Sequence, residues 1–199
     1  MDDPATDQSN WRTTGDWTTP TTHLAVELEL FLATAHRPDV TVAPTRCEPW
    51  TGDQVVAHVA ATFERFNEML AQSRSGDLTA PFGPDALNEA NQAAFESFSQ
   101  NAPNACERAV RTFLGLIDDP NELIAHQLGP IPVAVQAGFG LSELMLHHHD
   151  LLSAVDEVYR PSPGAPEAVV RGWTSAFDLP QLAQTTNVWN TLLDITDRS

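Results

Sequence analysis

One helix with a sharply marked start constrains the fold of this chain more than any other feature. Thr51 and Gln54 have the spacing of a capping box, which satisfies backbone N–H groups at the first turn of a helix. Trp50 and Val55 occupy the positions of a hydrophobic staple around that box. Apolar residues then recur at helical spacing as far as Arg74 and form one stripe that must be buried. The pattern predicts a long amphipathic helix that packs against other helices.

Helical patterns also dominate the rest of the chain, and no strand pattern of convincing length or fixed repeat is present. They cover residues 21–35, 85–117, 133–158, 165–177 and 182–195. Pro103 is expected to divide or kink the second of these, and short β-like pieces fit residues 124–135. We therefore predict an all-α protein, a four-helix bundle with extra C-terminal helices. The expected division is an N-terminal arm over 1–20, the bundle over 21–158, and a helical extension packed on it over 159–199.

Composition narrows the functional classes. The chain has 199 residues, of which 42% are apolar, and it contains no long uninterrupted apolar run and no signal-peptide pattern at its start. This favours a cytoplasmic protein with no membrane association. Ten basic residues face 27 acidic ones, and the formal charge of -17 disfavours nucleic acid as a partner. Two cysteines are too few for a disulfide framework, and Cys47 is interpreted as a partly buried structural thiol rather than a nucleophile.

A metal site is suggested by three residues of the helix expected over 133–158. Glu143, His147 and Asp150 have the spacing i, i+4, i+7 and so share one helix face. A carboxylate amid an apolar face is costly to bury without a charged partner or a metal ion. With His58 from the capped helix, we assign His58, Glu143 and His147 as ligands of a divalent metal, most simply Zn²⁺. The alternative for each fragment alone is a hydrogen-bonded core histidine or a local helix pair.

Several neighbouring residues receive secondary roles. Asp150 is expected either to orient an imidazole or transfer a proton, or to be a structural surface residue of its helix. His148 and His149 diverge from His147 around the helix and are expected to be peripheral. Asn91 and Arg108 are candidates to hold a polar or anionic cofactor, with solvent-facing helix positions as the alternative.

Two segments together resemble a known family. Residues 45–51, Thr-Arg-Cys-Glu-Pro-Trp-Thr, are followed by His58, and Glu143-x-x-x-His147-x-x-Asp150 lies downstream. This pattern resembles the mycothiol-dependent maleylpyruvate isomerase family, within the DinB-like superfamily of four-helix metalloproteins. The resemblance implies a DinB-like fold, a divalent metal, usually zinc, on His58, Glu143 and His147, and mycothiol or another low-molecular-weight thiol as cofactor. It also favours a homodimer.

Three functions remain open at this point. The resemblance implies that the metal activates the thiol as a thiolate, which attacks a small electrophile in an S-transferase or isomerase reaction. The same three ligands would also suit a metal-dependent hydrolase, in which the metal activates a water molecule. A noncatalytic bundle that keeps its metal for stability or for binding is the third. The expected partners are therefore a small-molecule thiol and an electrophilic substrate.

Overall fold

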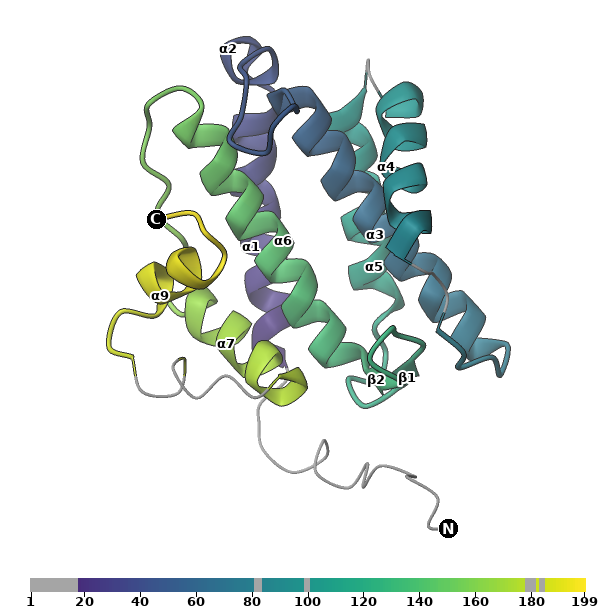
Figure 1. Cartoon of the computed structure of the whole chain (residues 1–199). Helices are drawn as coiled ribbons and strands as arrows, with labels where there is room; N and C mark the ends of the chain where they lie inside the picture. Colours follow the sequence, from purple (N-terminus) through teal and green to yellow (C-terminus); the bar gives the residue numbers. More distant parts are fainter. Residues whose placement is uncertain (1–17, 81–83, 99–100, 178–181, 183–184) are drawn as a thin grey trace.

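The computed structural model describes residues 18–80, 84–98, 101–177, 182 and 185–199. Four long helices form a bundle in which α1 and α6 lie side by side and run in one direction, while α3 and α5 lie side by side and run in the opposite direction (Figure 1). The helices of the bundle are α1 (Thr18–Ala35), α3 (Gly52–Arg74), α5 (Ala102–Leu116) and α6 (Val133–Ser153). The further elements are α2 (Pro38–Thr41), α4 (Pro84–Phe98), β1 (Leu123–Ile124), β2 (Ile131–Pro132), α7 (Ala165–Ala176) and α9 (Val188–Ile195). The predicted all-α bundle is confirmed.

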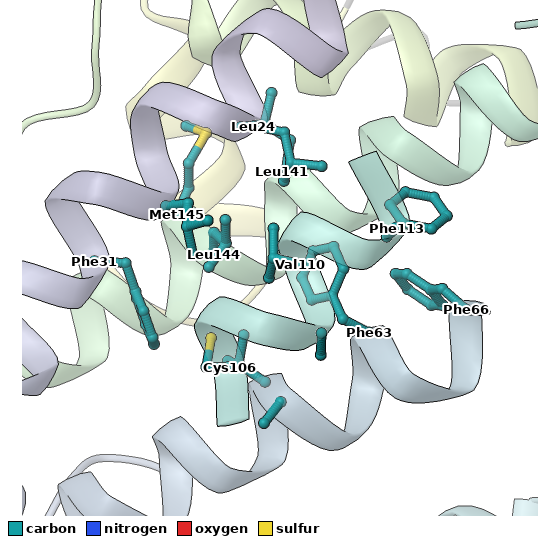
Figure 2. Close-up of a cluster of buried hydrophobic side chains, with 14 of the residues drawn as sticks. Leu24, Phe31, Phe63, Phe66, Cys106, Val110, Phe113, Leu141, Leu144 and Met145 are labelled. Atoms are coloured by element: carbon teal, nitrogen blue, oxygen red, sulfur yellow. The ribbon is translucent and has the colours of Figure 1, made fainter. Parts of the chain in front are cut away.

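The hydrophobic core lies between these four helices (Figure 2). The rings of Phe63 and Phe66 of α3 meet that of Phe113 of α5, with centroids 5.8 and 5.7 Å from the Phe113 centroid. Leu144 and Met145 of α6 are fully buried on the other side of the same core. Aromatic rings dominate the α3–α5 contact and aliphatic side chains fill the space toward α6. The apolar stripe read from the sequence of α3 is therefore what holds the bundle together.

Helix α3 begins and ends where the sequence predicts. Thr51 and Gln54 form the capping box, and Gln54 Oε1 accepts the backbone N–H of Thr51 at 3.0 Å. Gly52 follows directly because the backbone of Val40 crosses it: a Cβ atom at position 52 would lie 2.1 Å from the Val40 carbonyl oxygen. The end of α3 is a turn with Gly76 at φ +93°. The start of this helix therefore fixes the loop over residues 43–51 against α2.

Other boundaries differ from the prediction. Helix α6 ends at Ser153 rather than at residue 158, and Asp156 adopts a left-handed conformation at φ 58°. The N–H of Glu157 binds the carbonyl of Leu152 at 2.9 Å, and the N–H of Asp156 binds that of Ser153, as in a Schellman motif. No glycine marks this end in the sequence, so the apolar periodicity alone predicted a helix that continues too far. Helix α1 begins at Thr18, and most of the predicted arm lies outside the described residues.

The long helical pattern over 85–117 is divided, as expected, into α4 and α5, with Pro103 in the first turn of α5. The short β-like pieces are also present: β1 and β2 form an antiparallel pair before α6. Of the two helices expected after residue 164, α7 matches its predicted range within one residue, whereas α9 begins later, at Val188. None of the described helices combines the length and the apolar character needed to cross a membrane.

The C-terminal extension folds back against the bundle, and the turn after α9 lies next to α6 before the chain ends at the edge of the molecule (Figure 1). Helix α7 crosses α6 at two glycines, Gly138 and Gly172, where a Cβ atom on either residue would lie 3.1 Å from the Cα atom of the other. Helix α9 packs in turn on α7, and its Trp189 ring contacts Tyr159 and His149. The extension therefore reaches the face of α6 that carries the predicted site.

Candidate metal centre

Three of the predicted site residues meet between α3 and α6. The Nε2 atom of His58 lies 3.5 Å from Glu143 Oε2, and the Nε2 atom of His147 lies 3.4 Å from the same oxygen. One donor atom from each residue falls within 4.8 Å of the others. Residues separated by 85 positions in the chain thus present two imidazole nitrogens and one carboxylate oxygen to a common point. This donor set suits a divalent transition metal such as zinc.

The imidazole of His58 is held from its other side. Its Nδ1 atom lies 3.0 Å from Asn91 Oδ1 on α4, and its ring packs against Trp50 with centroids 5.1 Å apart. Trp50 itself contacts Phe95 edge to face. The staple position of the sequence therefore supplies a wall for the histidine ring. Asn91, a candidate to hold a polar cofactor, contacts this first histidine.

The imidazole of His147 is held in the same way. Its Nδ1 atom lies 3.0 Å from Asp150 Oδ2, one turn further along α6, and the Asp150 side chain is fully buried. Carboxylates in this position fix the ring orientation and the tautomer of metal-binding histidines. The orienting alternative for Asp150 agrees with this geometry, and its surface alternative is wrong, because no part of Asp150 is exposed.

These outer contacts test whether a cation fits the centre. A neutral imidazole that donates Nδ1–H to an oxygen keeps a lone pair on Nε2. Asn91 and Asp150 accept at Nδ1 of the two rings, so in their neutral forms both Nε2 lone pairs face the Glu143 carboxylate. Three electron-rich atoms at one point repel one another unless protons or a cation lie between them. The residues present therefore fit a divalent metal.

The charges around the centre follow the same logic. Burial opposes the ionisation of Glu143, but hydrogen bonds with His147 and His58 hold its pKa well below its usual range. Burial alone would also lower the pKa of His147, yet hydrogen bonds with Asp150, Cys47 and Glu143 raise it well above its ordinary value. Without a metal, a proton on His147 thus serves as the compensating charge. A metal ion at Nε2 would take the place of that proton.

Two residues near the site were not placed there by the sequence. The Sγ atom of Cys47 lies 3.2 Å from Asp150 Oδ2 and 4.0 Å from His147 Nδ1. Arg198, from the turn after α9, donates from Nε and Nη2 to the two oxygens of Asp150 at 3.0 and 3.1 Å. Burial raises the pKa of Asp150, but His147 and Arg198 outweigh it and lower that pKa to about 2. The sequence carries no periodicity that links a loop cysteine or a terminal arginine to α6.

The other candidates lie elsewhere. His148 lies outside the group of candidate ligands, as expected, and is buried: its Nε2 atom lies 2.8 Å from Thr34 Oγ1 of α1, and burial lowers its pKa to about 4. Helical geometry turns it about 100° away from His147, toward the α1 contact. His149 is half-buried beside Trp189 and Arg198. Arg108 is exposed on α5, and within the described part of the chain no hydrogen bond or ion pair joins it to the three candidate ligands.

A groove lies apart from this centre. This groove of about 480 Å³ lies where the end of α1 and α2 meet the first turns of α3 and α5. None of the three candidate ligands lines it. Its lining residues are Ala35, His36, Pro38, Thr41, Val42, Asp53, Asn101, Pro103 and Asn104.

Comparisons with known proteins agree with the fold. Residues 21–152 match the sequence profile described as the Mycothiol maleylpyruvate isomerase N-terminal domain. A crystal structure of the mycothiol-dependent maleylpyruvate isomerase is similar to this chain, with a TM-score of 0.63 and 15% sequence identity over 79% of this chain and 68% of that one. A crystal structure of a histidine-to-alanine mutant of that isomerase gives the same values. A search of curated proteins found none that matches this chain.

Proposed function

We propose, from the premise that this chain belongs to the mycothiol maleylpyruvate isomerase N-terminal domain family, that it is a metal- and thiol-dependent enzyme. Its cofactors would be a divalent metal, most simply Zn²⁺, and mycothiol or another low-molecular-weight thiol. The reaction would be an S-transfer to, or an isomerisation of, a small electrophile. The proposed reaction extends the family assignment from fold to chemistry.

One observation carries the proposal. The Nε2 atoms of His58 and His147 both face Glu143 Oε2, while Asn91 and Asp150 hold the opposite nitrogens. Three protein donors leave further coordination positions of a zinc ion for a small molecule, as in catalytic rather than structural sites. When bound there, a divalent cation favours the thiolate form of a coordinated thiol.

The protein's own residues have distinct parts in this scheme. His58, Glu143 and His147 would bind the metal, and Asn91 and Asp150 would keep the two imidazoles in the binding orientation. Trp50 and Phe95 close the His58 side with aromatic rings. The Glu143 side chain is about one-third exposed, whereas that of His147 is nearly buried, so the centre opens to solvent on the Glu143 side. A thiol cofactor would approach from there.

The proposal is tested with the zinc-loaded protein. Mycothiol is titrated by calorimetry, and a panel of small electrophiles is assayed with and without that thiol. We expect one thiol bound per metal and turnover that requires both. The matched variant is Glu143→Gln, which keeps the side-chain size but removes the anionic ligand, and we expect it to lose both properties.

Two results would redirect the assignment. Turnover of an ester or amide without thiol would indicate a metal-dependent hydrolase in place of the proposed reaction. Zinc binding with neither thiol binding nor turnover would indicate a noncatalytic metal-binding bundle. Each result leaves the family membership intact, because that membership follows from the sequence match.

A further inference from the structure

The turn that follows α9 brings an arginine to the rear of the metal centre. Arg198 Nε and Nη2 lie 3.0 and 3.1 Å from Oδ1 and Oδ2 of Asp150, so the planar guanidinium meets both carboxylate oxygens. Asp150 is fully buried and the Arg198 side chain is 19% exposed. Paired hydrogen bonds of this kind fix the orientation of a carboxylate as well as its charge. The Asp150 side chain therefore has little freedom to turn.

The backbone geometry of the turn sets the position of this arginine. The N–H of Arg198 binds the carbonyl of Leu193 at 2.8 Å, and the N–H of Asp197 binds that of Asp194 at 3.2 Å. These are the two bonds of a Schellman motif, with Asp197 in the left-handed conformation at φ 57°. The motif ends α9 and directs residue 198 toward α6.

Two further side chains hold the same turn from outside. Arg46 donates to the carbonyl oxygens of Arg198 and Asp197. His149 Nε2 lies 3.3 Å from the carbonyl oxygen of Arg198. Arg46 adjoins Cys47 in the loop before α3, and His149 adjoins Asp150 on α6. Two segments distant in the sequence therefore converge on the backbone of one residue, and its guanidinium points inward to Asp150.

We propose that Arg198 is a positioning residue of the metal centre, one that acts through Asp150 on the imidazole of His147. This inference rests on the proposed function, because it concerns the same metal ligands. Asp150 Oδ2 also accepts from His147 Nδ1 at 3.0 Å and from the Cys47 thiol at 3.2 Å. The arginine holds the carboxylate in the one orientation that serves both. It also compensates the buried negative charge when His147 is neutral and its Nε2 lone pair faces the metal.

The test measures zinc affinity by competition with a chromophoric chelator, with the full chain and without thiol or substrate. Removal of an outer partner of a metal-binding histidine typically weakens binding by about 10–100-fold, and we expect about tenfold for Arg198→Ala. Arg198→Lys keeps the positive charge but not the paired hydrogen bonds of the guanidinium, and its zinc affinity should lie between those of Arg198→Ala and the wild type. The control is Arg37→Ala, which deletes another arginine that bridges two carboxylates, Asp39 and Glu157, on the surface. It should leave zinc affinity unchanged.

A double-mutant cycle separates positioning from a general structural effect. Once Asp150→Ala has removed the intermediary, adding Arg198→Ala should weaken zinc binding no further. The visible spectrum of the cobalt-substituted protein should change in Arg198→Ala and not in Arg37→Ala, because it reports the ligand geometry directly. Circular dichroism selects a temperature at which every variant is folded.

The outcomes are distinct. A wild-type protein that binds zinc while Arg198→Ala binds it equally well would overturn this inference and leave the proposed function standing. An equal loss in the presence and absence of Asp150 would also overturn it, since Arg198 would then act through the fold. A wild-type protein without zinc affinity would overturn the proposed function and this inference with it.

Discussion

Helix α6 buries polar side chains on two faces, and the two faces differ in how those groups are satisfied. Toward α3, His147 lies between two carboxylates, Glu143 and Asp150. Toward α1, the next residue, His148, has one hydrogen-bond partner, Thr34, and rings of Phe31 and Tyr159 around it. Acceptors raise the pKa of the first histidine, whereas burial lowers the pKa of the second to about 4. The pKa values of these two adjacent histidines are therefore shifted in opposite directions, because His147 lies between two carboxylates and His148 is surrounded by a hydroxyl group and aromatic rings.

The α1 face has its own buried carboxylate, and it is closed rather than open. Glu27 is 1% exposed; it accepts a hydrogen bond from the Tyr159 hydroxyl and another from the backbone N–H of Ser162 at 2.7 Å. These partners join α1 to the segment after α6, and among the described residues Glu27 belongs to no group of side chains that could hold a metal. On the α3 face, by contrast, three donor atoms converge. A cation is therefore expected on one face only.

The largest expected effect separates the two histidines directly. His147→Ala removes a proposed ligand and should weaken zinc binding by more than about 100-fold, beyond what the loss of an outer partner costs. His148→Ala is the matched control on the other face and should keep zinc affinity within roughly twofold. Chelator competition on the two purified variants gives both numbers. Similar losses in both would contradict the division of α6 into a metal face and a structural face.

The next effect concerns the closed face. Glu27→Ala leaves the Tyr159 hydroxyl and the Ser162 N–H without their acceptor, and we expect a loss of about 3 kcal/mol in the free energy of unfolding. Glu27→Gln retains an acceptor oxygen and should lose less. Urea denaturation monitored by circular dichroism measures both. Zinc affinity should be unaffected, and a strong loss of zinc binding in Glu27→Ala would show that the two faces are coupled.

A further effect is on the pH dependence of stability in the metal-free protein. Folding lowers the pKa of His148 from 6.5 to about 4, so between these pH values the unfolded state binds the extra proton. Unfolding free energy should then fall by up to about 1.4 kcal/mol per pH unit as the pH drops through this window. In His148→Gln that contribution should vanish, and the difference between the two denaturation series isolates it from the other histidines.

His147 should produce the opposite trend at higher pH. Because its pKa is raised in the folded state, both states are protonated below pH 6.5 and its contribution there is constant. Above pH 6.5 the unfolded state loses the proton first, so this contribution declines as the pH rises. The same denaturation series, extended to alkaline pH with His147→Gln as reference, would show a wild-type decline absent from the variant. A wild-type curve parallel to that of His147→Gln would contradict this account.

The elements of this site differ in how far the sequence could predict them. The start of α3 was predictable because Thr51 and Gln54 interact locally, and the common face of Glu143, His147 and Asp150 follows from helical spacing. The divergence of His148 from the three candidate ligands also follows from helical spacing, but spacing does not show which helix covers it. Local patterns thus identify which residues share a helix face, but not which helix packs against that face.

The contacts made by irregular segments were beyond local reasoning. Cys47 lies in a loop, 103 residues before Asp150 in the sequence. Arg198 lies 48 residues after Asp150, in the turn that follows α9. Neither has a spacing rule that links it to α6. Asp156 and Asp197 end their helices in a conformation usually taken by glycine, so those turns carried no recognisable signal. Arg108 is exposed on α5, which agrees with the solvent-facing alternative given for it.

Helices α6 and α7 cross closely at Gly138 and Gly172, and this crossing leaves little room for a side chain on either residue. A methyl group on either residue would meet the other backbone at 3.1 Å, tighter than an ordinary contact, and would push α7 outward. Helix α9 packs on α7, and the turn after α9 carries Arg198, whose guanidinium binds the Asp150 carboxylate. A displacement of a few tenths of an ångström would thus be transmitted along two helices to a hydrogen bond of 3.0 Å. Gly138 and Gly172, which have no side chain, would therefore influence the alignment of the candidate metal centre through the position of α7.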